Sequence, residues 1–205
     1  MRTLPDPYVL AFLLADDVLL LLFYERLLAA LRGGFACLHS TYSTQEMLGN
    51  NYLSSSVNSI SLLFLPMFAQ TLVVEEVSRI GFWWTLVVLV GLRLFRDVVF
   101  LLVGWLSSRR TAFRHLETVS HAIAMMVMVA ALPTFLLGWL APSIPVLAGW
   151  IWLVATVAAG VVVYVWRASA IILQTRFSSY FWVLYLCGLE LLPICVAVNF
   201  LMHGN

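Results

Sequence analysis

The chain has 205 residues, of which 63% are hydrophobic and 10% charged, and its mean hydropathy is +1.00. Soluble domains carry about 25% charged residues, so this composition excludes an ordinary soluble protein. It predicts an all-α, polytopic bundle of transmembrane helices, with the lipid bilayer and other membrane or envelope proteins as partners. The net charge of +1 argues against binding to nucleic acid.

The first predicted span covers residues 8–24 and is apolar except for Asp16 and Asp17. Gly33–Gly34 is expected to end this element. The alternative is an amphipathic helix on the membrane surface, which would leave about five spans instead of six. Leu19–Phe23 favours a span, because it is apolar on every face and a surface helix needs a polar face.

Residues 35–56 form a polar segment, expected on the cytoplasmic side and rich in Ser, Thr and Asn. Within it, Ser43–Glu46 has the pattern of a capping box, which predicts a short interfacial helix ending at Gly49. Ser54–Ser56 is expected to cap a second span over residues 57–74.

Four further apolar runs are long enough to cross a bilayer and complete the predicted bundle. They are residues 80–106, 119–140, 146–166 and 180–202. Basic loops are expected at residues 107–115 and 167–179. Pro66, Pro133 and Pro193 are expected to kink their helices, since proline lacks the N–H that a helix interior needs.

The fifth run contains Ala155, Ala159 and Gly160. Small residues on one face of a membrane helix allow close contact with a neighbouring helix. We therefore expect this run to pack tightly against another span.

Loop arginines predict the orientation. With six spans, seven of them fall on one side: Arg26, Arg32, Arg109, Arg110, Arg114, Arg167 and Arg176. Only Arg2 and Arg79 fall on the other side. Cytoplasmic loops are enriched in Lys and Arg, so both termini are predicted outside the cytoplasm.

Ionisable residues inside the predicted spans are the most unusual feature of the sequence. They are Arg93, Arg96 and Asp97 in the third span, Glu190 in the last, and Asp16 and Asp17 in the first. Six isolated charges at the centre of a bilayer would cost on the order of 15–20 kcal/mol. We therefore predict a polar centre in which these residues pair with one another.

The spacing predicts two pairs within this centre. Arg93 and Asp97 stand four residues apart on one helix, which places them on one face. Glu190 is expected to pair with Arg96 across to the last span. The centre is interpreted either as a buried ionic latch that fixes helix register or as a functional site, such as a proton path, an ion path or a headgroup-binding cleft.

No catalytic, cofactor or metal site is predicted. The sequence contains no GxSxG, HExxH or P-loop pattern. His121, with His115 and Glu117, is expected at the cytoplasmic interface rather than at a metal. His39, His203 and the three cysteines (Cys37, Cys187 and Cys195) show no ligand spacing.

The last predicted span contains the string YLCGLELLP at residues 185–193. Its YLCxLExLP core resembles the C-terminal signature of an uncharacterised family of Gram-negative bacterial integral-membrane proteins, a domain of unknown function. The resemblance implies a bacterial inner-membrane protein, and it implies no activity, ligand or catalytic residue.

Three functions are compatible with these features. The first, which the sequence favours, is a scaffold or accessory subunit of a cell-envelope complex with no assigned molecular activity. The alternative is a small transporter or proton-coupled subunit that uses the polar centre. The third is an intramembrane enzyme acting on a lipid or polyprenyl headgroup, for which only His115, Glu117 and His121 are near the interface.

Overall fold

A computed structural model describes residues 6–74, 81–108, 110–140 and 146–174, together with residues 195, 196 and 199. Within these residues the chain forms eight helices and no strand. The helices are α1 (Pro7–Leu22), α2 (Tyr24–His39), α3 (Thr41–Gly49), α4 (Asn51–Leu63), α5 (Leu65–Val74), α6 (Phe82–Leu106), α7 (Arg110–Leu140) and α8 (Val146–Gln174). The all-helical prediction is confirmed for this part of the chain.

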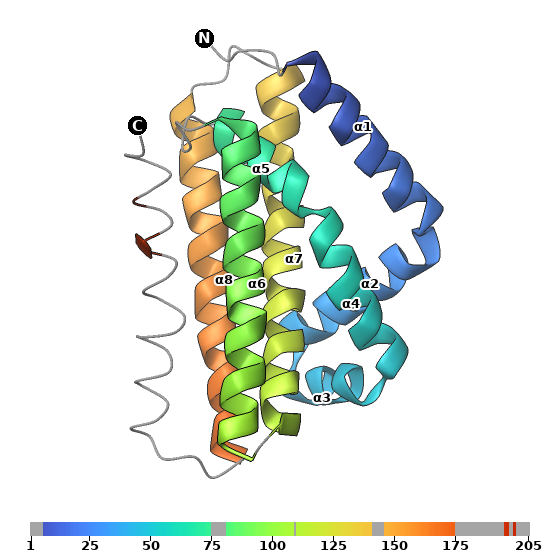
Figure 1. Ribbon diagram of the computed structural model, residues 1–205, viewed down its shortest axis with the longest axis vertical. Helices are drawn as coiled ribbons and strands as arrows, with labels where there is room; N and C mark the ends of the chain where they lie inside the picture. The colour runs from blue at the N-terminus through green and yellow to red at the C-terminus, as the bar shows by residue number, and fades with distance from the viewer. Residues whose placement is uncertain are drawn as a thin grey trace.

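Helices α6, α7 and α8 lie side by side, with α7 in contact with both of the others (Figure 1). At the contact of α7 with α8, Gly160 packs so closely that a Cβ on it would lie 2.3 Å from Cγ2 of Val127. The small-residue face of the fifth run is therefore used for close packing at Gly160. Ala155 and Ala159 instead stay exposed.

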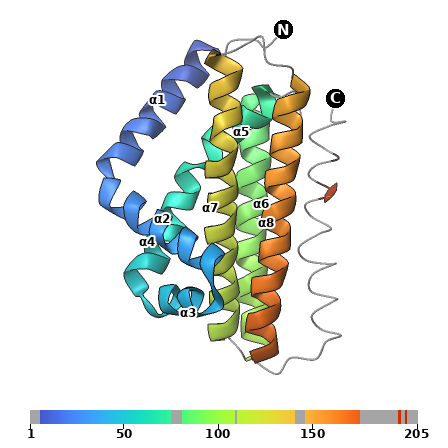
Figure 2. The same cartoon turned by 180° about the vertical axis from the view of Figure 1, so that it is seen from behind.

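A second layer, made of α2, α4 and α5, covers the other side of α7 (Figure 2). The main core lies between these layers, where side chains from several helices are almost completely buried. Its most buried members are Ala30, Cys37, Val57, Val119, Ala122 and Met125. This packing holds α4 against α7, which positions the site described below.

The first predicted span is a bent pair of helices. Helix α1 ends at Leu22, and α2 continues at an angle of 85° to it. Helix α1 is attached near the start of α6 through Phe12, whose ring lies 6.1 Å from that of Phe82 and 5.5 Å from that of Trp83.

Gly33 and Gly34 do not end the element, contrary to the sequence prediction, because both lie inside α2 and are buried. A Cβ on Gly33 would lie 2.8 Å from Cγ2 of Val57, and one on Gly34 would lie 2.6 Å from Sδ of Met126. The two glycines let α2 approach α4 on one side and α7 on the other.

The polar segment 35–56 is almost entirely helical. Helix α3 begins after Ser40, whose Oγ accepts a hydrogen bond of 3.0 Å from the backbone N–H of Ser43. Helix α4 begins after Asn50, whose Oδ1 accepts from the N–H of Tyr52 at 3.0 Å. The predicted starts of these two helices, at Ser43 and at residues 54–56, were therefore placed too late.

Two expected basic loops are largely helical as well. Helix α7 begins at Arg110 instead of residue 119, and α8 continues to Gln174 instead of stopping at residue 166. On this extension Arg167 is buried and donates a hydrogen bond of 3.1 Å to the carbonyl of Leu38, in the last turn of α2. Helix C-termini leave carbonyls without a partner inside the helix, so Arg167 ties α8 to α2.

The prolines differ in their effect. The break between α4 and α5 lies at Phe64, two residues before Pro66. Helix α7 continues through Pro133 without interruption. Pro193 lies outside the described residues.

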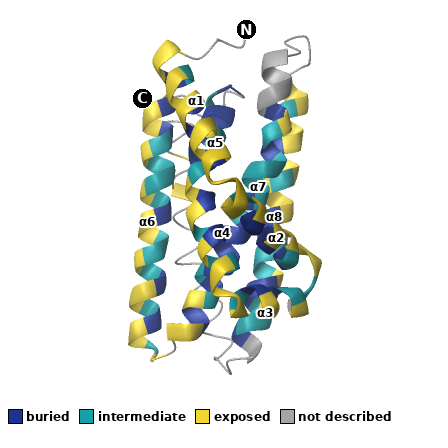
Figure 3. Cartoon of the chain, turned by 90° about the vertical axis from the view of Figure 1, so that its right-hand side faces the viewer, coloured by how far each residue is buried: buried dark blue, intermediate teal, exposed yellow. Residues whose placement is uncertain are grey.

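Among the described helices, three are long and apolar enough to cross a membrane, or four if α1 and α2 together count as one broken span. The three are residues 51–74, which are α4 and α5 counted as one helix, and residues 110–134 and 147–172. Helix α6 is also 25 residues long, although it contains three charged residues. Large apolar side chains are exposed along α1, α6 and α8 (Figure 3), as expected for a membrane protein. The run at 180–202 lies almost wholly outside the described residues.

Candidate functional site: a polar cavity between three helices

Arg93 is buried in the middle of α6, with 8% of its surface exposed. Its Nε lies 3.6 Å from Oδ2 of Asp97, one turn along the same helix. Its Nη1 donates a hydrogen bond of 2.7 Å to Oγ of Ser61, and its Nη2 one of 3.2 Å to the carbonyl of Asn58. The ion pair expected from the i,i+4 spacing is thus present, and α4 supplies two further acceptors.

His121 of α7 joins the same network and is almost completely buried. Its Nε2 lies 2.9 Å from Oδ1 of Asp97. Its Nδ1 lies 3.1 Å from Nη2 of Arg93 and also 3.1 Å from Oδ1 of Asn58. Buried polar groups are costly unless they are paired. Here five side chains from three helices pair with one another, although Nε of Arg93 has no hydrogen bond among the described residues.

The two partners of Nδ1 correspond to different positions of the ring proton. When Nδ1 accepts from Arg93, the proton is on Nε2 and is donated to Asp97. When Nδ1 donates to Asn58, a neutral ring presents the lone pair of Nε2 toward Asp97. A neutral imidazole has one donor and one acceptor nitrogen, so only the tautomer with the proton on Nε2 keeps the hydrogen bond of 2.9 Å to the Asp97 carboxylate.

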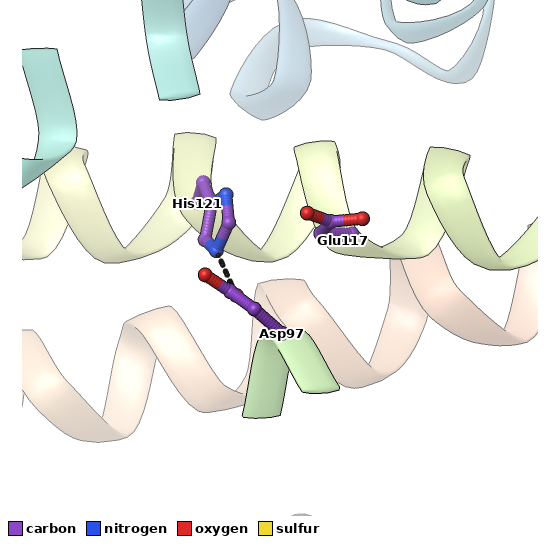
Figure 4. A group of neighbouring side chains, drawn as sticks. All are labelled: Asp97, Glu117 and His121. Carbon is purple, nitrogen blue, oxygen red and sulfur yellow. Dashed lines mark hydrogen bonds and ion pairs between the residues drawn. The ribbon is translucent and has the colours of Figure 1, made fainter. Parts of the chain in front are cut away.

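Glu117 lies one turn before His121 on α7, and its carboxylate is next to the other two ligand-type groups (Figure 4). One oxygen each from Asp97 and Glu117 and one ring nitrogen of His121 lie within 4.8 Å of one another. The site therefore holds two carboxylates and one imidazole close together.

These residues line a cavity of about 850 Å³ between α4, α6 and α7. The wall from α4 is polar and includes Asn51, Ser54, Ser55, Asn58 and Ser59. The wall from α7 carries Arg110, Arg114, Glu117, Thr118 and His121. The lining also includes Arg93, Asp97 and several apolar residues of α6.

The cavity occupies only one half of the bundle. It extends from Arg110, at the turn between α6 and α7, to His121. Eleven residues of α helix span about 16 Å, roughly half of a 30 Å hydrocarbon layer. The other half is packed with apolar side chains, where Leu72, Ala131 and Leu153 meet.

The structure brings together only part of the predicted polar centre. Arg93 and Asp97 belong to it. Asp16 is buried on α1, and its Oδ2 has no hydrogen-bond partner in the described part of the chain. Among the described residues, no ion pair or hydrogen bond connects Asp16 or Asp17 with α6, so their place in the centre stays a prediction.

The predicted pair of Arg96 with Glu190 stays untested, because Glu190 lies outside the described residues. Within the described ranges, Nε of Arg96 is buried and has no hydrogen-bond partner.

The sequence prediction placed His121 at the cytoplasmic interface, outside the polar centre, and it missed Asn58 and Ser61. A signal for His121 exists in the spacing of polar residues. On α7, Arg110, Arg114, Glu117 and His121 recur at intervals of four, three and four residues, which places them along one face of a helix. This stripe was hidden because residues 107–115 were assigned to a loop.

Comparison of the chain with protein-family models, with curated proteins and with solved structures gives no match. The function is therefore argued from the cavity and its charged groups.

Proposed function

We propose that the chain is a six-span protein of the bacterial inner membrane that acts as a small ion transporter. Arg93, Asp97 and His121 would contact the ion at the inner end of the cavity. The excess of arginines on one side supports a cytoplasmic opening and periplasmic termini. The YLCxLExLP resemblance supports a location in the inner membrane. It also supports membership of the uncharacterised family of integral-membrane proteins that carries this signature.

The one-sided cavity is the observation that supports transport over a purely structural latch. A latch needs only mutual pairing, and Arg93 and Asp97 already provide that at 3.6 Å. The charged residues instead line a polar space of about 850 Å³. A polar space reaching half the depth of the bundle, closed beyond by apolar packing, suits a transporter open to one side. Ionisable residues within membrane spans typically mark such pathways.

Ion flux in liposomes tests this proposal. Purified protein is reconstituted, a gradient of HCl, KCl or MnCl₂ is imposed, and a potential-sensitive dye follows charge movement. We expect at least one gradient to collapse faster than in protein-free liposomes. Asp97→Asn should slow that flux by about tenfold, the effect of losing a charge-assisted contact of roughly 1.5 kcal/mol.

Asp17→Asn is the matched control, because it removes an acidic residue from a predicted span outside the network. It should leave the flux unchanged. Equal rates with and without protein for all three gradients would refute ion transport. Equal slowing by the two variants would refute the role of the network.

The alternative function, an accessory subunit of an envelope complex, has one observation in its favour. An apolar groove of about 360 Å³ lies along α7 and α8 and includes Trp152, Ala155 and Ala159. Small residues at such a surface allow a neighbouring helix to approach closely. Co-purification of one partner at a fixed ratio, lost in Ala155→Leu but kept in Leu94→Ala on α6, would support this function over transport.

A further inference from the structure

We propose that Asp97, Glu117 and His121 form a binding site for a divalent transition-metal ion of the Zn²⁺ class. The site would have three protein ligands and at least one open coordination position. Metal binding does not depend on transport, so this inference and the proposed function can fail separately.

The donor atoms and their spacing support this assignment. Two carboxylate oxygens and one imidazole nitrogen lie within 4.8 Å of one another. In a tetrahedral zinc site with bonds of about 2.0–2.2 Å, neighbouring ligand atoms are about 3.4 Å apart. Binding therefore requires the contact of 2.9 Å between Asp97 and His121 to widen slightly and the Glu117 carboxylate to turn inward. Both are side-chain movements on intact helices.

The orientation of His121 provides a second, independent observation. A metal-bound histidine commonly donates its other ring N–H to an oxygen acceptor, which fixes its tautomer. Oδ1 of Asn58 lies 3.1 Å from Nδ1 of His121 and can accept that proton once Nη2 of Arg93, which lies equally close to Nδ1, moves away. The ring then stays neutral, its proton moves from Nε2 to Nδ1, and the Nε2 lone pair faces Asp97 and Glu117.

The space around the ligands also fits a bound ion. Asp97 and Glu117 supply two negative charges, and Arg93 already offsets one of them. Arg93 lies beside Oδ2 of Asp97, while the contact with His121 is made by Oδ1, so each oxygen has its own partner. All three ligand residues line the cavity, which leaves room for water or an anion at the open position. Imidazole with carboxylate donors suits Zn²⁺, Fe²⁺ or Mn²⁺ better than Cu⁺.

Direct titration of the detergent-purified, untagged full-length chain tests the site. Co²⁺ serves as a coloured substitute for Zn²⁺, and its visible absorption reports the ligands. We expect one ion per chain, displaced by Zn²⁺. Asp97→Asn and His121→Gln should abolish this saturable binding. Asn58→Leu removes only the oxygen that positions His121 and should weaken binding by about 10–100-fold.

Matched controls are Asp17→Asn and His39→Gln, which remove an acid and an imidazole elsewhere and should leave the affinity unchanged. Where a variant fails to fold, X-ray absorption of the Zn²⁺-loaded wild-type protein decides the outcome. One imidazole with oxygen ligands at about 2.0–2.2 Å supports the site. Sulfur ligands, several imidazoles, or the absence of saturable binding would overturn it.

Discussion

Arg93 shows how a charge is accommodated inside this bundle. Its guanidinium is 8% exposed and contacts a carboxylate, a hydroxyl, a carbonyl and an imidazole. Transferring an ion out of water costs several kcal/mol unless its hydrogen-bonding groups are satisfied. The surrounding acceptors come from three helices, so Arg93 also fixes their relative positions.

Replacing Arg93 should therefore destabilise the protein strongly. In Arg93→Gln, Asp97 loses its ion pair, and the polar groups of α4 lose their donors. We expect a loss of about 3–5 kcal/mol in the free energy of unfolding, typical for breaking a buried pair. Thermal unfolding in detergent measures this loss.

Arg32→Gln serves as the control, since Arg32 is an exposed arginine on α2. Exposed substitutions usually change stability by less than about 0.5 kcal/mol. If the two variants unfold at the same temperature, the network around Arg93 contributes nothing to stability.

At the residue scale, the predicted contact that the structure confirms lies within one helix. The pair of Arg93 and Asp97 follows from helical spacing alone. The contact of Asp97 with His121 joins residues 24 positions apart on two helices. Which face of α7 meets α6 depends on packing, including the close approach at Gly104, where a Cβ would lie 3.2 Å from Cβ of Phe113.

At the scale of helices, glycines determine how closely α7 and its neighbours pack. Gly160→Ala should destabilise the contact of α7 with α8 by about 1–3 kcal/mol, the usual cost of overpacking. The reason is that the new methyl group would overlap Cγ2 of Val127 at 2.3 Å. Thermal unfolding again provides the measurement.

A double variant separates this clash from other effects. Val127→Ala should partly restore the stability lost in Gly160→Ala. Gly91→Ala is the matched control, because a Cβ at Gly91 has no neighbour within 4 Å, and alanine favours helix. Additive losses in the double variant would contradict direct contact between these two positions.

Helix ends were less predictable than helix existence. Hydropathy marks the part of a helix that suits the bilayer, whereas the helix itself continues as long as its backbone hydrogen bonds are satisfied. Arg110–His115 and Arg167–Gln174 are polar or mixed in composition and still helical. Gly33–Gly34 resembles the end of a helix for a different reason. Glycine is common both where a helix ends and where two helices pack closely.

For the molecule as a whole, the side of the membrane on which the turn between α6 and α7 lies predicts the side on which the cavity opens. Their connecting turn at Ser107–Ser108 is expected in the cytoplasm, and the start of α6 outside it. Variants with one added cysteine at Ser108 or Trp83, both exposed, test this in a background that lacks Cys187 and Cys195 and keeps the buried Cys37. A membrane-impermeant maleimide added to intact spheroplasts should label Trp83→Cys only.

Inside-out vesicles should reverse the pattern, with labelling of Ser108→Cys only. Ser55→Cys, in the wall of the cavity, should follow Ser108→Cys in both preparations. Labelling of Ser108→Cys from the outside would invert the proposed orientation, and no labelling of Ser55→Cys from either side would exclude a water-filled cavity.

The order of the apolar runs could be read from the sequence, but their arrangement could not. Composition shows which segments suit a bilayer. It does not show that Phe23 lies at a sharp bend, because residues 19–23 are as apolar as the rest of the run. Nor does it show which helices become neighbours, since similar depth along two helices does not place them side by side.

The bend at Phe23 also has a consequence for how the chain is made. Helix α2 fits between α4 and α7. The carbonyl of Leu38 accepts its hydrogen bond from Arg167, which is synthesised 129 residues later. We therefore expect α2 to reach its final position only after α7 and α8 have been synthesised.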